Sequence, residues 1–306
     1  MNILITGGAG FIGSHICEYL IKLGNKVSVV DNLSTGYLKN LKNIIKLIDF
    51  YQVSLEYFNL NYLQNIDVVV HLAAQVSVPL SINNFYTSSS SNLIGTIKMI
   101  DFCKHKKIPL VYASSSAIYG NLNIADDEKH FVDLLSPYAT DKYAMELYCK
   151  VANQLFQLPS LGLRFFNVYG PRQDPKSAYS GVISVFCDRL SKDMDITING
   201  GSQTRDFVYV GDVVKAIHSS IGILKQNPIS THVNVLTGRS VSINYISDLI
   251  SKSLKKIGNK KYADLPKGEP LNSNGTTNKM QSLLQINPAF MTKIEDGLLD
   301  TINFIK

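Results

Sequence analysis

Short apolar runs alternate with amphipathic stretches through the first half of the chain. The runs are continuous rather than interrupted by polar residues, which is typical of strands that are buried on both faces of a parallel sheet. The intervening stretches carry apolar residues at helical spacing and predict helices. The predicted strands lie at residues 2–8, 26–32, 67–74, 109–116 and 160–170, and the predicted helices at 11–24, at 91–107 and from 136 onward.

The first predicted strand runs into the glycine-rich segment TGGAGFIG, with Gly7, Gly10 and Gly13 spaced by three residues. Such glycines allow a tight turn and a close approach of the backbone to a pyrophosphate, while the following helix N-terminus supplies N–H groups and positive potential. Asp31 ends the second predicted strand. A carboxylate there binds the ribose hydroxyls of NAD and repels the 2′-phosphate of NADP. The sequence therefore predicts an NAD-binding site.

Strands and helices in this order predict a Rossmann-type α/β fold, a doubly wound parallel sheet with helices on both faces. Beyond about residue 168 the rhythm breaks into turn-rich segments such as GPRQDPKS and INGGSQTRD. We therefore predict an NAD-binding domain over residues 1–168 and a smaller, mixed α/β substrate lobe over 169–306. Part of 205–238 is expected to return and pack on the first domain.

Composition and charge indicate a soluble protein that binds neither nucleic acid nor membrane. The chain has 306 residues, 45% of them hydrophobic, and a net charge of +6. The densest basic stretches, Lys104–Lys107 and Lys252–Lys261, lack interleaved aromatic residues, so a solvated helix face explains them better than a nucleic-acid patch does. No run approaches the roughly 18 apolar residues that a membrane span needs.

The cysteines and the N-terminus indicate a cytoplasmic protein. Cys17, Cys103, Cys149 and Cys187 lie far apart with no Cys-x-x-Cys spacing, which predicts buried, reduced thiols and neither a disulfide framework nor a metal site. The segment MNILITGG enters an apolar strand at once and has no basic n-region, so no signal peptide is expected.

The segment SPYATDKYAMELY holds the one Tyr-x-x-x-Lys pair in the chain, Tyr138 and Lys142. At i and i+4 the two residues share one face of the predicted helix. An ammonium beside a phenol favours the phenolate, so we expect Lys142 to lower the pKa of Tyr138 toward neutrality. Each residue alone is compatible with core packing or solvent exposure. The serines of SSSAIYG, at the end of the fourth strand, add hydroxyls at the edge where ligands bind in such sheets.

These motifs, together with HLAA and LRFFNVYGPR, resemble those of the extended short-chain dehydrogenase/reductase family. More narrowly, the chain is similar to the 4-epimerases of UDP-glucose and UDP-N-acetylglucosamine, and GSQTRDFVYVGDVVKAI and PKGEPLNS extend the similarity into the second half. The resemblance implies an NAD-dependent enzyme of UDP-sugars that forms a homodimer.

The resemblance also implies roles for individual residues. Ser115 would be the catalytic serine, Tyr138 the general base, and Lys142 the residue that binds the nicotinamide ribose. The implied cofactor residues are Gly7, Gly10, Phe11, Ile12, Gly13, Asp31, Asn32, Ser34, Thr35, Gly36, Leu72, Ala73, Ala74, Asn92, Ser114, Tyr138 and Lys142. The implied substrate residues are Ser77, Ser115, Ser116, Asn167, Val182, Thr197, Arg205, Glu269 and Ser273.

The chain departs from the family pattern at three places. Ser54 stands where the family often has an aspartate that binds adenine. Pro266, with Lys267 beside it, occupies the position of a second arginine for the diphosphate, and GTTNK replaces a later Ala-Asp pair. The expected anchors for adenine and the diphosphate are therefore fewer than in the family.

The reaction implied by the resemblance is 4-epimerisation. Related dehydratases and decarboxylases carry an acid in the catalytic loop, where this chain has Ala117 and Ile118 after the serines. What remains is oxidation at C4 of the sugar and re-reduction from the opposite face. A related dehydratase, decarboxylase or reductase is the first alternative, and a non-catalytic NAD sensor on the same fold is the second.

The sugar is predicted from two features. The segment RQDPKSAYSGVISVF is similar to one in bacterial UDP-N-acetylhexosamine 4-epimerases. Ser273 matches a position that is bulky in family members restricted to non-acetylated sugars and small in those that accept an N-acetyl group. UDP-GlcNAc and UDP-GalNAc are therefore the expected pair, with UDP-Glc and UDP-Gal as further substrates. The alternative is that Ser273 is an ordinary surface residue.

Overall fold

The apolar run VVVH forms a strand, β4 (Val68–His71), in which all four residues are buried. A strand with no exposed face belongs in the middle of a covered sheet, and β4 does lie between β1 and β5. The computed structural model describes residues 1–177, 180–256, 258–265 and 269–305.

The chain divides into two units, each combining three chain segments. The first holds residues 1–118, 134–164 and 214–233, and the second holds 119–133, 165–213 and 234–306. The division at residue 168 that the sequence predicts is contiguous, whereas these units interleave along the chain. We describe each unit by itself.

The first unit is built on a seven-stranded sheet of order β10-β6-β5-β4-β1-β2-β3. The pairs that join β3, β2, β1, β4 and β5 are parallel, and the order 3-2-1-4-5-6 is that of a Rossmann sheet. The predicted fold class is therefore confirmed. Its elements are β1 (Asn2–Thr6), α1 (Phe11–Lys22), β2 (Lys26–Asp31), β3 (Ile48–Gln52), β4, α2 (Val78–Asn83), α3 (Phe85–Ser89), α4 (Gly95–Lys104), β5 (Leu110–Ser115), α5 (Pro137–Phe156), β6 (Ser160–Phe165), α7 (Val210–Gln226) and β10 (Ser230–Val235).

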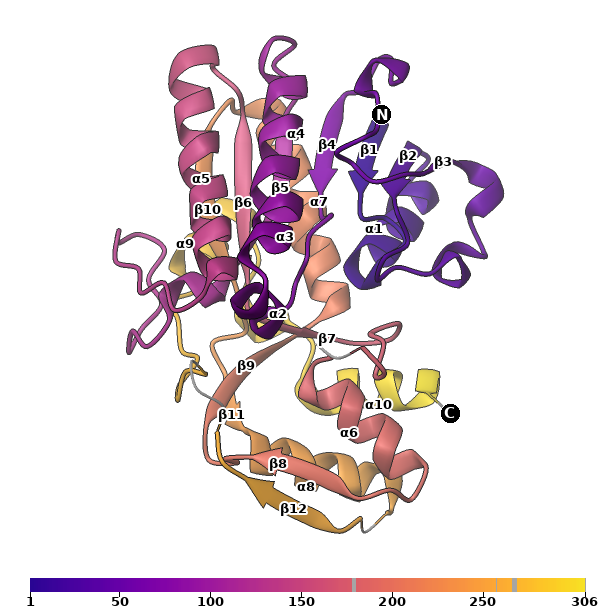
Figure 1. The fold of residues 1–306 in the computed structure, drawn as a ribbon, viewed down its shortest axis with the longest axis vertical. Helices are drawn as coiled ribbons and strands as arrows, with labels where there is room; N and C mark the ends of the chain where they lie inside the picture. Colours follow the sequence, from indigo (N-terminus) through magenta and orange to yellow (C-terminus); the bar gives the residue numbers. More distant parts are fainter. Residues whose placement is uncertain (178–179, 257, 266–268, 306) are drawn as a thin grey trace. The chain divides into compact units, whose positions relative to one another are not determined.

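Helices cover both faces of this sheet. Figure 1 shows α4 and α5 side by side in front of the strands and α7 behind them. Met99 of α4 and Met145 of α5 share one buried cluster with Leu4, Val69 and Leu110 of the sheet. Tyr19 of α1 meets His218 of α7 edge to face, with ring centroids 5.2 Å apart. Burial of these apolar faces is the main stabilising contribution to the unit.

The second unit contains two smaller sheets. β9 (Thr204–Tyr209) pairs with β7 (Asn167–Tyr169) in parallel and with β11 (Ser240–Ser242) in antiparallel fashion, while β8 (Ile196–Asn199) pairs with β12 (Lys260–Ala263). The helices are α6 (Val182–Ser191), α8 (Ile243–Leu254), α9 (Asn278–Leu284) and α10 (Ile294–Ile305). A core of Phe186, Leu190, Ile246, Ile250 and Leu298 joins α6, α8 and α10.

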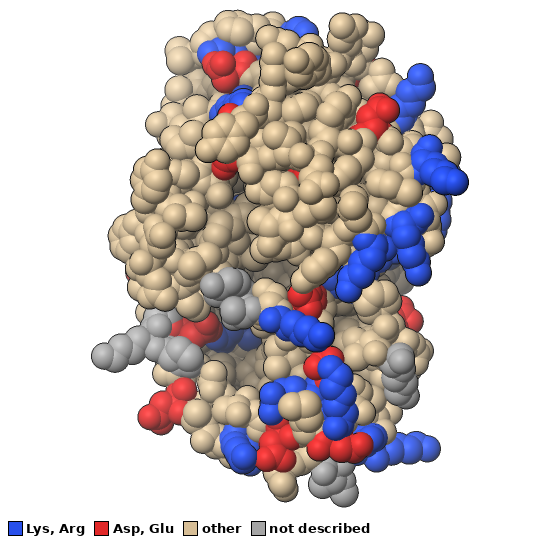
Figure 2. Space-filling model, turned by 45° about the vertical axis from the view of Figure 1, so that its right-hand side comes forward, with Lys and Arg blue, Asp and Glu red and all other residues tan. Residues whose placement is uncertain are grey.

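Charged side chains of both signs are interspersed on the surface. Figure 2 shows acidic side chains among the basic ones on the face that it draws. Within the basic stretch Lys252–Lys261, Lys256 pairs with Asp193 at 2.5 Å and Lys261 with Asp195 at 2.9 Å, and Lys260 pairs with Asp248. Acidic partners for these lysines fit a solvated surface better than a phosphate-binding patch. Among the described residues, no helix is long and apolar enough to span a membrane.

Candidate active site

β1 leads into α1 through a turn built around Gly7, whose φ is +74°. A Cβ on Gly7 would lie 2.7 Å from the Ala73 nitrogen, and one on Gly13 would lie 2.0 Å from the Gly7 oxygen. Any larger residue would therefore displace the backbone. Gly10 is the N-cap of α1, and no side chain caps this helix. A bare helix N-terminus behind closely packed glycines fits a bound pyrophosphate.

The carboxylate of Asp31 is fixed at the end of β2 by two backbone N–H groups. Oδ2 accepts a hydrogen bond from the Ala9 nitrogen at 2.9 Å, and Oδ1 accepts one from the Leu33 nitrogen at 2.8 Å. Burial raises the pKa of Asp31, and these two hydrogen bonds oppose that rise. The carboxylate thus holds the glycine turn against β2 while standing where an NAD ribose would bind.

The residues after β2 form a small polar network. Asn32 donates from Nδ2 to Ser54 Oγ at 2.9 Å and accepts at Oδ1 from the Ser34 nitrogen at 3.0 Å. Ser54, which replaces the family's aspartate, is therefore a partner of Asn32. The other predicted cofactor residues lie on adjoining element ends: Phe11 and Ile12 at the start of α1, Thr35 and Gly36 after β2, and Leu72, Ala73 and Ala74 after β4.

Asn92 organises the loop that follows β4. It lies in a π-helical turn, Ser90–Ile94, where its Oδ1 accepts from the Gln75 nitrogen at 2.8 Å and its Nδ2 donates to the Gln75 oxygen at 3.1 Å. Ser77 in the same loop caps α2, because its Oγ accepts from the Leu80 nitrogen at 3.0 Å. Both side chains have protein partners, and their predicted ligand contacts stay predictions.

The three predicted catalytic residues all lie in the first unit. α5 begins with Ser136 as N-cap and Pro137 as its first residue, which places Tyr138 and Lys142 in its first turns. Tyr138 is hydrogen-bonded to Ser115 at the end of β5. Lys142 Nζ donates to the Ala113 oxygen at 2.7 Å and lies 5.7 Å from the centre of the Tyr138 ring. The structure therefore brings Ser115, Tyr138 and Lys142 together.

The electrostatics of this group differ from the expectation. Burial raises the pKa of the Tyr138 phenol, and the hydrogen bond with Ser115 opposes that rise. Burial also lowers the pKa of Lys142 to about 8, against the charge of Asp141, which raises it. The expected fall of the Tyr138 pKa toward neutrality is thus wrong for the protein alone, because desolvation raises the pKa of the phenol. The Lys142 ammonium is bonded to the Ala113 oxygen instead.

Two carboxylates on α5 were missed by the sequence analysis. Asp141 accepts a hydrogen bond from Ser89 at 2.8 Å and faces Ser88 and Asn92, so it joins α5 to α3. Glu146 accepts from Ser114 Oγ at 2.6 Å. Ser114 was predicted to contact the cofactor, but its side-chain hydroxyl is buried against Glu146. Neither carboxylate belongs to a recognisable motif, and only their helical spacing from Tyr138 and Lys142 could have pointed to them.

Six predicted substrate residues lie in the second unit. Arg205 of β9 donates from Nη2 to Glu269 Oε2 at 2.8 Å, so these two form an ion pair. Asn167 of β7 donates to the Asp206 oxygen at 3.3 Å. Val182 begins α6, the exposed Thr197 lies on β8, and Ser273 is half-buried. Ser116, the remaining one, begins a 3₁₀ turn after β5.

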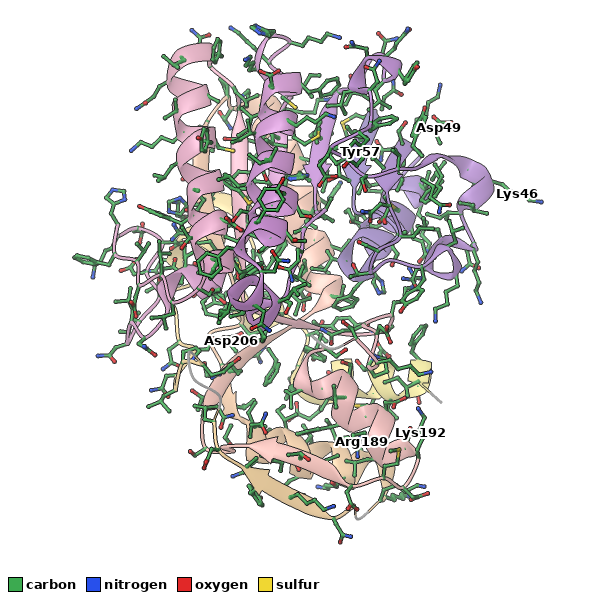
Figure 3. All side chains as sticks on the ribbon, in the orientation of Figure 1. Lys46, Asp49, Tyr57, Arg189, Lys192 and Asp206 are labelled. Atoms are coloured by element: carbon green, nitrogen blue, oxygen red, sulfur yellow. The ribbon has the colours of Figure 1, made fainter. Side chains whose placement is uncertain are left out.

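Asp206, labelled in Figure 3, fixes the strand that carries Arg205. Its fully buried carboxylate accepts from the Thr237 nitrogen at 2.8 Å, the Thr237 hydroxyl at 3.0 Å and the Arg239 nitrogen at 3.0 Å. Pro266 and Lys267 lie outside the described residues. In the part of the chain that the structure describes, no group of three or more acidic, histidine or cysteine side chains could hold a metal ion.

The chain is similar to known proteins over most of its length. Residues 3–235 match the NAD dependent epimerase/dehydratase family. A candidate UDP-glucose 4-epimerase of Methanocaldococcus jannaschii is 40% identical over 274 residues, covering 87% of each chain.

Two solved structures are similar over nearly their whole length. The UDP-N-acetylglucosamine 4-epimerase of Methanobrevibacter ruminantium M1, in complex with UDP-N-acetylmuramic acid, is 34% identical with a TM-score of 0.93 and covers 99% of this chain and 97% of its own. The UDP-glucuronic acid 4-epimerase of Bacillus cereus, in complex with UDP-glucuronic acid and NAD, is 32% identical with a TM-score of 0.91 and covers 100% and 99%.

The position of Asp31 predicts how the site chooses its dinucleotide. Asp31→Asn removes the charge that would repel a 2′-phosphate, so the preference for NAD over NADP should fall by about tenfold or more. Dissociation constants of both dinucleotides, measured by calorimetry on cofactor-free protein, give this ratio. Asn40→Ala is the matched control, because Asn40 holds the same turn through the Ala9 oxygen. It should weaken both dinucleotides equally, and an unchanged ratio in Asp31→Asn would contradict the assignment.

Proposed function

The chain belongs to the NAD dependent epimerase/dehydratase family, and we propose that it is a 4-epimerase of UDP-hexoses, acting chiefly on UDP-GlcNAc and UDP-GalNAc. Its cofactor is NAD, as the sequence predicted. The observation that carries the proposal is the joined set of Ser115, Tyr138 and Lys142. Ala117 and Ile118 follow the serines, so this loop offers no carboxylate for elimination chemistry.

Tyr138 is the proposed acid–base residue. Its phenolate would take the proton of the sugar C4 hydroxyl, and NAD, held by the glycine turn and Asp31, would supply the hydride acceptor for C4. Once the 4-keto sugar has rotated to present its opposite face for re-reduction, Tyr138 would return the proton to the C4 oxygen. No net oxidation occurs, so a single bound cofactor recycles.

Ser115 and Lys142 prepare Tyr138 for this step. The Ser115 hydroxyl lowers the pKa of the phenol by hydrogen bonding, and its proposed second role is to bind the sugar oxygen that gains or loses the proton. The Lys142 ammonium is held at the Ala113 oxygen, from which its remaining N–H groups would reach the nicotinamide ribose. The positive charge of oxidised NAD would add to that of Lys142 and lower the phenol pKa further.

The second unit supplies the proposed contacts to the UDP group. The guanidinium of Arg205 is suited to binding a diphosphate. In this structure it binds the carboxylate of Glu269. Asn167, Val182 and Thr197 are proposed to bind the rest of the nucleotide sugar. These assignments follow from the family resemblance, and the ion pair with Glu269 shows that the Arg205 guanidinium is able to bind a carboxylate.

Ser273 is the proposed determinant of sugar size. Thr204, next to Arg205, donates from its nitrogen to the Leu271 oxygen at 3.0 Å and from its hydroxyl to Asn272 Oδ1 at 3.2 Å. Ser273 therefore follows residues bound beside the proposed diphosphate arginine. A small side chain there leaves volume for an acetamide group.

Other functions of the family are less well supported. A dehydratase or decarboxylase would need an acid in the catalytic loop, and a non-catalytic NAD sensor would not require the Ser115–Tyr138–Lys142 set. UDP-Glc with UDP-Gal, or UDP-glucuronate, would each be a different substrate for the same reaction. Incubating the protein with each UDP-sugar without added NAD, and following the products by NMR, tests the proposal. Formation of a 4-epimer supports it, and a keto-deoxy or decarboxylated product contradicts it.

Tyr138→Phe should abolish turnover while leaving the fold and UDP binding intact. Loss of a positioned acid–base group typically lowers kcat by about 10²–10⁴-fold. Lys142→Met should also lower kcat strongly, because the phenol loses its neighbouring cation. Tyr143→Phe removes a hydroxyl from the same helix and serves as the control with near wild-type kcat. A wild-type rate in Tyr138→Phe would contradict the mechanism.

Ser273→Tyr should reduce kcat/KM for UDP-GlcNAc and UDP-GalNAc more than for UDP-Glc and UDP-Gal. Steric exclusion from a packed site costs about 1–3 kcal/mol, or roughly ten- to a few-hundred-fold in selectivity. Ser273→Ala keeps the side chain small and should keep the wild-type preference. Equal losses for both sugar pairs would show that Ser273 does not contact the sugar.

We further propose that the protein is a cytoplasmic homodimer. On α5, Leu147, Tyr148, Val151 and Leu155 form one stripe and are 46%, 47%, 48% and 70% exposed. A second copy is the proposed occupant of this stripe, because an antiparallel copy of the same helix would cover it with matching apolar residues. The four cysteines are free and buried, which suits a reducing compartment.

Val151→Glu should convert the dimer to a monomer, because it places a charge in the centre of the stripe. Sedimentation equilibrium measures the mass. Leu299→Glu is the control: Leu299 is 50% exposed on α10, and its replacement should leave the mass unchanged. A monomeric wild-type protein would overturn the assignment.

A further inference from the structure

Three consecutive residues at the end of β5 are bonded to three residues of α5 that lie one helical turn apart. The pairs are the Ala113 oxygen with Lys142 Nζ at 2.7 Å, Ser114 Oγ with Glu146 Oε1 at 2.6 Å, and Ser115 with Tyr138. We call these six residues the strand–helix ladder. Two of its three pairs hold the proposed catalytic residues, and the third, Ser114 with Glu146, has no role in the reaction described above.

The Glu146 carboxylate is fixed from its other side by Arg164 of β6. Arg164 Nε donates to Oε1 at 2.9 Å and Nη2 donates to Oε2 at 2.6 Å, with both side chains at most 4% exposed. His232 of β10 lies 3.5 Å from Oε2 through its Nδ1. The carboxylate therefore has partners on β5, β6 and β10, and its position is set by three strands at once.

A buried ion pair of this kind is weak evidence for a role in stability. Replacing such a pair with apolar side chains is often neutral or stabilising, because desolvation offsets much of the attraction. An apolar pair could not provide an acceptor for the hydroxyl of Ser114, a residue that is only 2% exposed. The directional bond to Ser114 is thus the property that the ion pair supplies.

We propose that Glu146 is a positioning residue of the reaction, which acts through Ser114 to hold the end of β5 in register with Tyr138 and Lys142. Ser115 follows Ser114 directly, so a shift of this backbone would lengthen the bond from Ser115 to Tyr138. Ala113 precedes Ser114, so the same shift would move the acceptor of Lys142. The inference rests on the proposed function of these catalytic residues, and it gives Ser114 a partner in the protein in place of the cofactor contact predicted from the sequence.

Ser114→Ala removes the hydroxyl while leaving the Glu146–Arg164 pair intact. We expect kcat to fall on the order of ten- to a hundredfold, as for small misplacements of reacting groups, with KM within about twofold of wild type and the bound NAD content unchanged. Ser114→Thr retains a hydroxyl and should restore most of kcat. Ser160→Ala is the matched control, because Ser160 is a buried serine at the start of β6 that hydrogen-bonds Ser230 at 2.8 Å; it should leave kcat unchanged.

A second variant removes the carboxylate itself. Glu146→Met combined with Arg164→Met replaces both charges, so no unpaired ion stays buried and the protein should remain folded. It should show the same loss of kcat as Ser114→Ala. Adding Ser114→Ala to this variant should cause little further loss, because the two changes break the same link.

Hydrogen exchange gives a readout that does not depend on turnover. In Ser114→Ala, the backbone amides of residues 113–116 should exchange faster than in the wild type, while Ser160→Ala should not affect them. If the wild-type protein epimerises no UDP-sugar, the proposed function fails and this measurement still tests the link. Unchanged kcat and exchange in Ser114→Ala would overturn the positioning role, and loss of bound NAD from that variant would return Ser114 to the cofactor site.

Discussion

The burial of Lys142 is the constraint on which the site depends. Its side chain is 2% exposed, and a buried ammonium without an acceptor would be very costly. The Ala113 oxygen meets that need at 2.7 Å. Ala113 lies two residues before the end of β5. Its bond to Lys142 therefore places the first turns of α5 at the carboxyl end of that strand. That placement puts Tyr138 beside Ser115.

The predicted cofactor site is also shaped by hydrogen bonds within the protein. Asp31 satisfies the N–H groups of Ala9 and Leu33, so the carboxylate that would read the ribose also holds the glycine turn on β2. Asn40 binds the Ala9 oxygen from the other side. The turn is therefore shaped by groups of the protein before any ligand arrives. Such pre-organisation lowers the ordering cost of binding.

Much of this could be predicted from the sequence because the signals were local. Continuous apolar runs gave the parallel strands, glycine spacing gave the β1–α1 turn, and Tyr138 with Lys142 marked α5. The ion pair of Glu146 and Arg164 could not be found in this way, because its partners lie on different elements and are brought together only by the order of β5 and β6. The orientation of the Ser114 hydroxyl could not be predicted from the sequence either, for the same reason. Its hydroxyl turns to Glu146 because that carboxylate is already fixed by Arg164.

The pKa of Tyr138 shows a second limit of local reasoning. The helical spacing of Tyr138 and Lys142 was read correctly, but their mutual effect depends on how much water surrounds them. Desolvation disfavours the charged forms of both groups, raising the pKa of the phenol and lowering that of the amine. In the protein alone the phenol of Tyr138 is therefore neutral, whereas Lys142, with a pKa of about 8, still carries its proton at neutral pH. The charge needed for proton transfer must then be stabilised by the ligands that complete the site.

The segment around Ser273 in the second unit is anchored by its backbone. The chain around Ser273 is held through carbonyl oxygens: Leu271 by the Thr204 nitrogen, Ser273 by Ser240 Oγ at 2.5 Å, and Asn274 by the Ala125 nitrogen at 2.8 Å. Since none of these bonds uses the side chain of residue 273, a larger side chain there would leave the main-chain path in place. The proposed catalytic residues are thus held by buried polar contacts in the first unit, whereas the proposed determinant of sugar size is a side chain on a backbone-anchored segment.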